Sequence, residues 1–259
     1  MDTLRTEPLS EYVLLLTLDR PQVRNAIDGR MAAELGGFFR SLKGSGDDLR
    51  AIVITGAGSA FCAGADLKER LGMTEEAWVE HHLFLEEAFA AIRRCPVPLV
   101  AAVNGAAIGG GCELMLACDL TVAAETATFS HPEVRRGIIP GCGATWTLPR
   151  VIGVPRAKEM ILTGRTVAAA EALGWGLVNR VVPEPEVLPA ARALAEAIAS
   201  NGPVAVRNAR RALDEGLGLA QEDGVACELD AYRRTLASED RREGIDAFNE
   251  KRPPRFRNR

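Results

Sequence analysis

Two short apolar runs, each followed closely by a glycine-rich segment, constrain the fold of this chain more than any other feature. Residues 51–54 precede the segment from Gly56 to Gly64, and residues 99–103 precede Gly109-Gly110-Gly111. Short buried strands that end in glycine-rich loops are typical of α/β proteins. Further short apolar runs alternate with amphipathic stretches and lie at residues 12–18, 120–123, 127–129 and 177–182. The pattern therefore predicts an α/β core.

The end of the chain lacks this alternation. After about residue 182 the sequence contains amphipathic helical patterns only. We predict a core over residues 1–195 that carries the active site, and a C-terminal α-helical region over residues 196–259. The run Pro183-Glu184-Pro185 is the best candidate for an internal hinge.

Polar residues and glycines mark the predicted helix ends. Asp28 is expected to cap a helix that runs to about Leu42, where Gly44-Ser45-Gly46 break it. Thr74 is expected to cap a second, long helix. A third helix is expected to begin near Cys112, directly after the glycine triplet.

The composition excludes several classes of function. The net charge of −4 provides no general attraction to nucleic acid or to an anionic membrane. No apolar run approaches the roughly 20 residues that span a bilayer, and the first residues do not resemble a signal peptide, so a cytoplasmic protein is expected. The six cysteines form no C-x-x-C pair and there are three histidines, so neither disulfides nor a metal site are expected.

Neither glycine-rich segment has the sequence of a nucleotide-binding loop. The run Gly56-Ala57-Gly58-Ser59-Ala60-Phe61 lacks the third glycine of the dinucleotide motif, and neither segment ends in the Lys-Ser/Thr pair of a phosphate-binding loop. The alternative is that the loops point backbone N–H groups at an anionic oxygen, because a helix that follows glycines exposes unpaired donors. Two such loops on neighbouring strands can form an oxyanion hole.

Three segments in order along the chain are together specific for one family. The first runs from Val53 to Glu69, the second from Asn104 to Asp119, and the third from Phe129 to Gly141. They resemble the three signatures of the crotonase (enoyl-CoA hydratase/isomerase) superfamily, and the likeness covers essentially the whole chain. Arg20-Pro21 near the start and Lys251 to Pro254 at the end also fit.

The resemblance implies a fold, an assembly and a binding site. The implied fold is a spiral of ββα units with a C-terminal helical trimerisation region, as homotrimers or as hexamers made of two trimers. Ala65 and Gly110 are implied to supply the two N–H groups of the oxyanion hole. No cofactor is expected, because coenzyme A is part of the substrate. The residues implied to line the coenzyme A and substrate path are Arg24, Ala63, Ala65, Asp66, Leu67, Lys68 and Gly110, with Phe248 and Lys251 reaching coenzyme A on a neighbouring subunit.

Two glutamates carry the predicted chemistry. Hydration of a conjugated thioester needs one carboxylate to deprotonate water at Cβ and one carboxylic acid to give a proton to Cα. Glu113 lies one turn into the helix that carries Gly110, and Glu133 follows Pro132 in a loop. Two carboxylates in a dry pocket repel each other's charge, which keeps one of them protonated. Isomerases of the superfamily generally keep one of this pair. The pair therefore favours an enoyl-CoA hydratase of fatty acid metabolism over an isomerase or an acyl-CoA hydrolase.

The substrate and any RNA association depend on a narrower resemblance. Residues 62–70 and 240–255 are similar to the methylglutaconyl-CoA hydratase branch, whose animal member also binds RNA through lysines on an early helix. In this chain that helix offers Arg30, Arg40 and Lys43 but no row of lysines, so RNA binding is not expected.

A dicarboxylic substrate would need a cation near the acyl tail, and three candidates lie close to Glu133 in the sequence, namely His131, Arg135 and Arg136. Trp146 departs from the family pattern. It is expected to reshape the acyl pocket, to contact a neighbouring subunit, or to lie partly buried as a core or interface aromatic.

Overall fold

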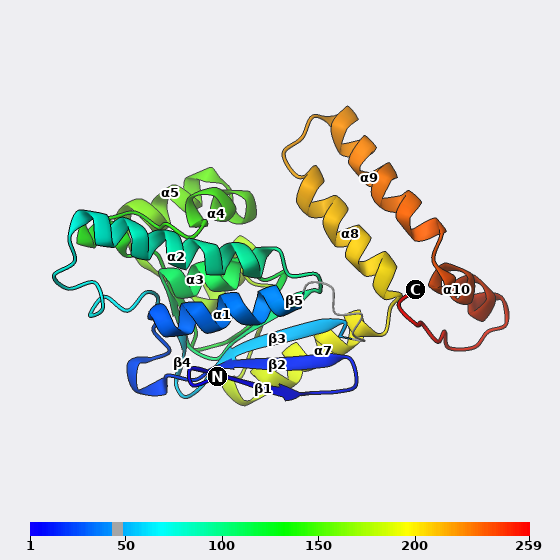
Figure 1. The fold of residues 1–259 in the computed structure, drawn as a ribbon, viewed down its shortest axis with the longest axis horizontal. Helices are drawn as coiled ribbons and strands as arrows, with labels where there is room; N and C mark the ends of the chain where they lie inside the picture. The colour runs from blue at the N-terminus through cyan, green and yellow to red at the C-terminus, as the bar shows by residue number, and fades with distance from the viewer. Residues whose placement is uncertain (43–48) are drawn as a thin grey trace.

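A six-stranded sheet forms the base of the molecule (Figure 1). The computed structural model describes residues 1–42 and 49–259, so Lys43 and the predicted break at residues 44–46 lie outside the described residues. The first strand is antiparallel to the second, and the others are parallel. The strands are, in order across the sheet, β1 (Leu4–Pro8), β2 (Val13–Leu18), β3 (Ala51–Gly56), β5 (Leu99–Val103), β7 (Leu120–Ala124) and β10 (Arg180–Val182).

The predicted strands of this sheet are confirmed, and one strand was missed. β3 and β5 are buried along almost their whole length, as expected for parallel strands that are covered on both faces. β1 was not predicted because only Leu4 of its five residues is buried. It is an edge strand, so its polar side chains face solvent and show no apolar pattern.

A second, smaller sheet lies beside the first. Its strands are β4 (Ala60–Cys62), β6 (Ala106–Ile108), β8 (Thr128–Ser130) and β9 (Thr166–Ala168), in that order. β4, β6 and β8 are parallel, and β9 is antiparallel to β8. Successive strands therefore alternate between the sheets, with β3, β5 and β7 in the large one and β4, β6 and β8 in the small one. A helix follows each such pair, which confirms the ββα spiral.

Helices cover the two sheets and begin close to the predicted positions. Asp28 caps α1 by accepting the Met31 N–H at 2.8 Å, and Thr74 caps α2 by accepting the Ala77 N–H at 3.2 Å, so both predicted caps are confirmed. The third helix begins at Gly110, two residues before the predicted Cys112. The helices of the core are α1 (Gly29–Ser41), α2 (Glu75–Arg93), α3 (Gly110–Leu116), α4 (Ala144–Ile152), α5 (Val154–Thr163) and α6 (Ala169–Trp175).

The C-terminal part is helical, as predicted. α7 (Val187–Ala199) belongs to the core, because it packs on the large sheet through Ala191, Ala195 and Ala199. The predicted boundary at residue 195 thus lies inside α7. The helices that follow stand to one side of the core (Figure 1); they are α8 (Pro203–Gly216), α9 (Gln221–Leu236) and α10 (Glu239–Asn249).

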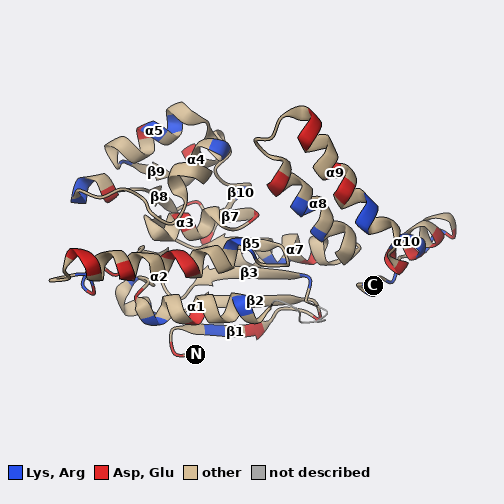
Figure 2. Ribbon diagram, turned by 45° about the horizontal axis from the view of Figure 1, so that its top comes forward, with Lys and Arg blue, Asp and Glu red and all other residues tan. Residues whose placement is uncertain are grey.

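Acidic and basic residues are mixed along these outer helices (Figure 2). Two of the pairs within α8 and α9 are Arg211–Glu215 at 2.8 Å and Arg234–Asp230 at 3.0 Å. Several large apolar side chains on the same helices are exposed, including Leu213, Leu217 and Tyr232. No helix in the described ranges is long and apolar enough to cross a membrane. The six cysteines are free.

Candidate active site

A pocket lies at the carboxyl ends of three adjacent strands of the small sheet. Residues that follow β4, β6 and β8 all line it, among them Ala65, Gly110 and Glu133. The pocket-lining parts of the two glycine-rich segments therefore follow the short strands β4 and β6. The sequence alone predicts them directly after the apolar runs that form the longer strands β3 and β5. Parallel strands bring their carboxyl ends to one edge, so three loops far apart in the sequence converge there.

Two backbone N–H groups meet at this edge. The Gly110 N–H is at the first turn of α3, and neither it nor the Ala65 N–H donates a hydrogen bond to a described residue. Gly64 holds the two segments close together, because its φ is +89° and a Cβ built on it would lie 3.2 Å from the Gly110 nitrogen. The arrangement can bind a negatively charged oxygen, as the loops predicted.

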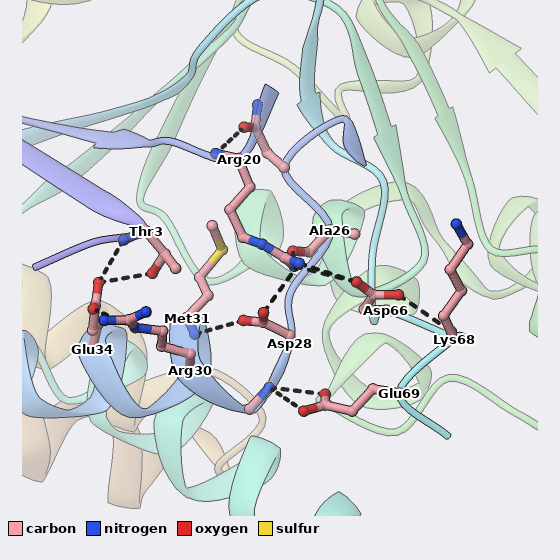
Figure 3. Close-up of polar contacts among 12 residues, drawn as sticks. Thr3, Arg20, Ala26, Asp28, Arg30, Met31, Glu34, Asp66, Lys68 and Glu69 are labelled. Atoms are coloured by element: carbon pink, nitrogen blue, oxygen red, sulfur yellow. Dashed lines mark hydrogen bonds and ion pairs between the residues drawn. The ribbon is translucent and has the colours of Figure 1, made fainter. Parts of the chain in front are cut away.

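Ion pairs hold the loop that carries Ala65 against the start of α1 (Figure 3). The Arg20 guanidinium lies 3.1 Å from the Asp28 carboxylate and 3.3 Å from the Asp66 carboxylate. Glu69 accepts the Gly29 N–H at 2.9 Å. The Asp66 side chain therefore contacts Arg20 and lies away from the pocket, so it positions the loop. This function was not predicted for it.

A tight turn brings Arg24 beside the same loop. Arg24 and Asn25 have φ values of 54° and 57°, and the Arg24 carbonyl accepts the Ala63 N–H at 2.9 Å. The Asn25 side chain is fully buried and donates to the carbonyl oxygens of Ala57, Ala60 and Phe61 at 2.9 to 3.2 Å. Asn25 is thus a structural residue, and the exposed Arg24 side chain stands next to the loop.

Glu113 lies inside the pocket and is 4% exposed. Its Oε1 accepts the N–H groups of Cys142 at 2.7 Å and Ala144 at 3.0 Å. Burial raises the pKa of Glu113, and the nearby charge of Glu133 raises it too, while the two N–H groups and His131 lower it. The net effect is a raised pKa, which suits a carboxyl group that exchanges a proton near neutral pH.

Glu133 faces the same pocket from the other side of the glycine triplet. A Cβ built on Gly109 would lie 2.8 Å from Glu133 Oε1, and the Gly109 φ is +53°, so only glycine fits there. Glu133 Oε2 is buried and accepts no hydrogen bond from the described residues. His131 is fully buried with Nδ1 3.7 Å from Glu133 Oε1. A carboxylate oxygen without a protein partner is available to hold a water or to transfer a proton.

The sequence did not identify the far wall of the pocket. α2 provides His82, Leu85 and Phe89, which lie on one helix face at spacings of three and four residues. Arg70 also lines this wall. The helical spacing is a usable signal for the α2 residues, but it does not separate a pocket wall from an ordinary core face.

Some of the predicted site residues lie at the mouth of the pocket or away from it. Leu67 lines the pocket and Lys68 is exposed beside it. Phe248 lies on α10 and is 83% exposed, and Lys251 follows it; within one chain neither lines the pocket. The structure leaves untested their predicted contact with coenzyme A on a neighbouring subunit.

Three of the remaining predicted residues have other surroundings. Trp146 does not line the pocket; it lies on α4, is 56% exposed and stacks on the Arg150 guanidinium at 4.1 Å. Of the three expectations for Trp146, this position excludes a place in the acyl pocket and a place in the buried core. Arg135 donates to the Thr163 carbonyl at 3.1 Å and is exposed, whereas Arg136 reaches the pocket mouth.

The fold is that of the crotonase class. An enoyl-CoA hydratase from Bacillus anthracis superposes with a TM-score of 0.96 at 40% identity, covering 99% of this chain and 100% of that one. The chain belongs to the enoyl-CoA hydratase/isomerase family, whose model matches residues 9–259.

Two curated relatives extend this match over nearly the whole length of both chains. YngF of Bacillus subtilis (strain 168), whose name reads enoyl-CoA hydratase/isomerase, is 45% identical over 94% of each chain. The enoyl-CoA isomerase/hydratase fer4 of Mycosarcoma maydis is 39% identical over 93% of this chain and 91% of the relative. Both names include two reactions, so the choice between them depends on the pocket.

Proposed function

We propose that this protein is an enoyl-CoA hydratase that adds water reversibly across the 2,3 double bond of an enoyl-CoA thioester. The observation that carries the proposal is the presence of two carboxyl groups, Glu113 and Glu133, in the pocket where the N–H groups of Ala65 and Gly110 meet. An isomerase moves a proton between two carbons of the substrate, which a single carboxyl group can do. Hydration needs both a base for the water and an acid for Cα, and this pocket contains two such groups.

In the proposed reaction the thioester carbonyl oxygen accepts the two N–H groups, which stabilise the charge that develops on it. One glutamate takes a proton from the water as its oxygen bonds to Cβ, and the other gives a proton to Cα as the double bond becomes single. The pair thus exchanges roles over a turnover and keeps one proton in total. The raised pKa of Glu113 fits a pair that shares one proton at neutral pH.

The binding of coenzyme A is proposed from the residues around the pocket mouth. Arg24, Ala63, Leu67 and Lys68 lie beside or along the mouth and would contact the coenzyme. Phe248 and Lys251 would complete the site from a neighbouring subunit in a trimer or hexamer. The exposed apolar residues of α8 and α9 support such an assembly.

The wider setting is also part of the proposal. The substrate brings its own coenzyme A, so the reaction needs no further cofactor or metal. A cytoplasmic place in fatty acid metabolism is proposed on the strength of the bacterial relatives. An RNA-binding function gains no support from α1, where Arg30 pairs with Asp2 and lies 3.6 Å from Glu34.

The test is hydration of a panel of enoyl-CoA thioesters that includes crotonyl-CoA and methylglutaconyl-CoA. Loss of the conjugated-thioester absorbance together with a product heavier by one water shows hydration, whereas an isomer has unchanged mass. Replacing Glu113 or Glu133 by Gln is expected to lower kcat by about 10²- to 10⁴-fold, the usual range for a proton-transferring group. Glu125→Gln, an exposed glutamate on the loop after β7, is the matched control. Activity retained by the double variant would contradict the proposal.

A further inference from the structure

One buried cation in the pocket forms no ion pair with a carboxylate of the described residues, although the charge of Glu69 acts on it. Arg70 is 9% exposed and lines the pocket, yet its guanidinium makes no hydrogen bond or ion pair with a described residue, and its Nε is buried without an acceptor. Its side chain is held by the Trp78 ring, 4.8 Å from the guanidinium carbon. In contrast, the neighbouring Arg20 and Arg93 both pair with carboxylates.

An unpaired buried charge is costly, and proteins usually compensate it with an opposite charge that also forms hydrogen bonds to it. Arginine stays protonated at any physiological pH even where burial lowers its pKa, as it does for Arg70. The guanidinium also offers several N–H donors in a fork that matches the two oxygens of a carboxylate. A ligand that brings a carboxylate into the pocket would therefore complete this part of the site.

The position of Arg70 fits the far end of the acyl group. Arg70 and Cys142 line the same pocket, and the Arg70 charge opposes the rise that burial causes in the pKa of the Cys142 thiol. The Cys142 N–H in turn donates to Glu113. A Cβ built on Gly141 would lie 2.3 Å from His82 Cε1, so the His82 ring lies directly against the segment 141–142. An acyl chain that enters at Gly110 and passes Glu113 thus approaches Arg70 and His82.

The other cations around the pocket are less suited to this role. Arg136 is exposed at the mouth and donates to the Pro132 carbonyl at 3.2 Å. Lys68 is exposed and is suited to the phosphates of coenzyme A, which remain in solvent. We propose, on the basis of the proposed hydratase function, that Arg70 binds a carboxylate at the distal end of the acyl group and selects enoyl thioesters of dicarboxylic acids.

The test compares two substrates that differ only at their end. Glutaconyl-CoA carries a terminal carboxylate where pent-2-enoyl-CoA carries a methyl group, and the ratio of their kcat/KM values measures the selectivity. Arg70→Gln is expected to lower this ratio by about 10- to 100-fold, the usual effect of losing a hydrogen bond to a charged group. Arg70→Lys should recover part of the ratio, and Arg94→Gln, an exposed arginine at the end of α2, should leave the ratio as in the wild type.

Binding of saturated analogues separates this inference from the proposed reaction. Calorimetry with glutaryl-CoA and pentanoyl-CoA gives a ratio of Kd values that needs no turnover, and Arg70→Gln should shift it toward pentanoyl-CoA. If this ratio shifts while neither enoyl-CoA is hydrated, the inference holds and the proposed hydratase function fails. The inference is overturned if pent-2-enoyl-CoA is hydrated but Arg70→Gln lowers kcat/KM equally for both substrates. It is also overturned if Arg136→Gln changes the ratio and Arg70→Gln does not.

Discussion

Gly64→Ala is the substitution that tests the oxyanion hole most directly. Gly64 has a φ of +89°, and a Cβ built on it would lie 2.6 Å from the Ile108 carbonyl oxygen and 3.2 Å from the Gly110 nitrogen. All three nearest atoms belong to the backbone, so the loop that carries Ala65 must move away from Gly110. The change therefore separates the two N–H donors without altering any titratable group.

The size of the effect follows from two contributions. Placing alanine in the left-handed region costs about 1–2 kcal/mol of stability. Loss of one oxyanion donor costs about 3–4 kcal/mol in the transition state, which is about 10²- to 10³-fold in kcat. We expect Gly64→Ala to lower kcat by that factor. KM should change little, because the ground-state carbonyl depends less on the two donors than the transition state does.

A matched glycine separates strain from the effect on the site. Gly72 has a φ of +78° and no atom within 4 Å of a Cβ built on it, so Gly72→Ala carries the backbone strain alone. Both variants are assayed by the loss of thioester absorbance and by thermal unfolding. If folded Gly64→Ala keeps a kcat close to that of Gly72→Ala, the assignment of the two N–H groups is refuted.

Three further predictions test the remaining parts of the site and the assembly. Because burial raises the pKa of Glu113 above its usual 4.5, the folded protein holds a proton that the unfolded chain releases, so the free energy of unfolding falls as pH rises from 4.5 through that raised pKa. Glu113→Gln should remove this fall. Chemical denaturation from acidic to neutral pH measures the free energy of unfolding, and an unchanged slope of that energy against pH in the variant would contradict the prediction. Asn25→Ala removes the side-chain donor to three backbone carbonyls, of which those of Ala60 and Phe61 are buried. It should lower the free energy of unfolding by at least about 2 kcal/mol in the same assay, and a loss below about 1 kcal/mol would be evidence against the structural function. Leu213 is 74% exposed and borders a groove with Trp146, so Leu213→Glu should reduce a trimeric mass to a monomeric one in light scattering, and an unchanged mass would place the interface elsewhere.

The sequence was informative wherever a feature depends on local chemistry. Asp28 and Thr74 were predicted as caps because a side-chain oxygen before a helix satisfies nearby N–H groups, whatever the rest of the fold does. The buried strands β3 and β5 were predicted from continuous apolar runs. Gly110 and Glu113 were connected by a physical argument, since one helical turn separates them on the same element.

Features that depend on distant contacts were not predictable in this way. β4, β6 and β9 have three residues each, too few to show a period, and they form strands because neighbouring strands supply their hydrogen bonds. Arg70 follows the family signature, but its burial, and the lack of an ion pair to it from the described part of the chain, are visible only once α2 and the segment 141–142 surround it. The ion pair of Asp66 with Arg20 was not predictable for the same reason, because Arg20 lies 46 residues away in the sequence.

The small sheet explains how four separate groups could meet at one thioester in the proposed reaction. Ala65 follows β4, Gly110 and Glu113 follow β6, and Glu133 follows β8, and these strands are neighbours in that order. Adjacent strands lie about 4.8 Å apart, so the three loops fall within reach of a single acyl group. Each turn of the ββα spiral contributes one part, and the middle turn contributes both an N–H donor and a carboxyl group from one rigid helix. The separation of the Gly110 N–H from Glu113, the proposed proton-transferring group, is thus set by helix geometry, whereas the positions of Ala65 and Glu133 depend on loops. We therefore expect the reaction to tolerate changes in α3 least.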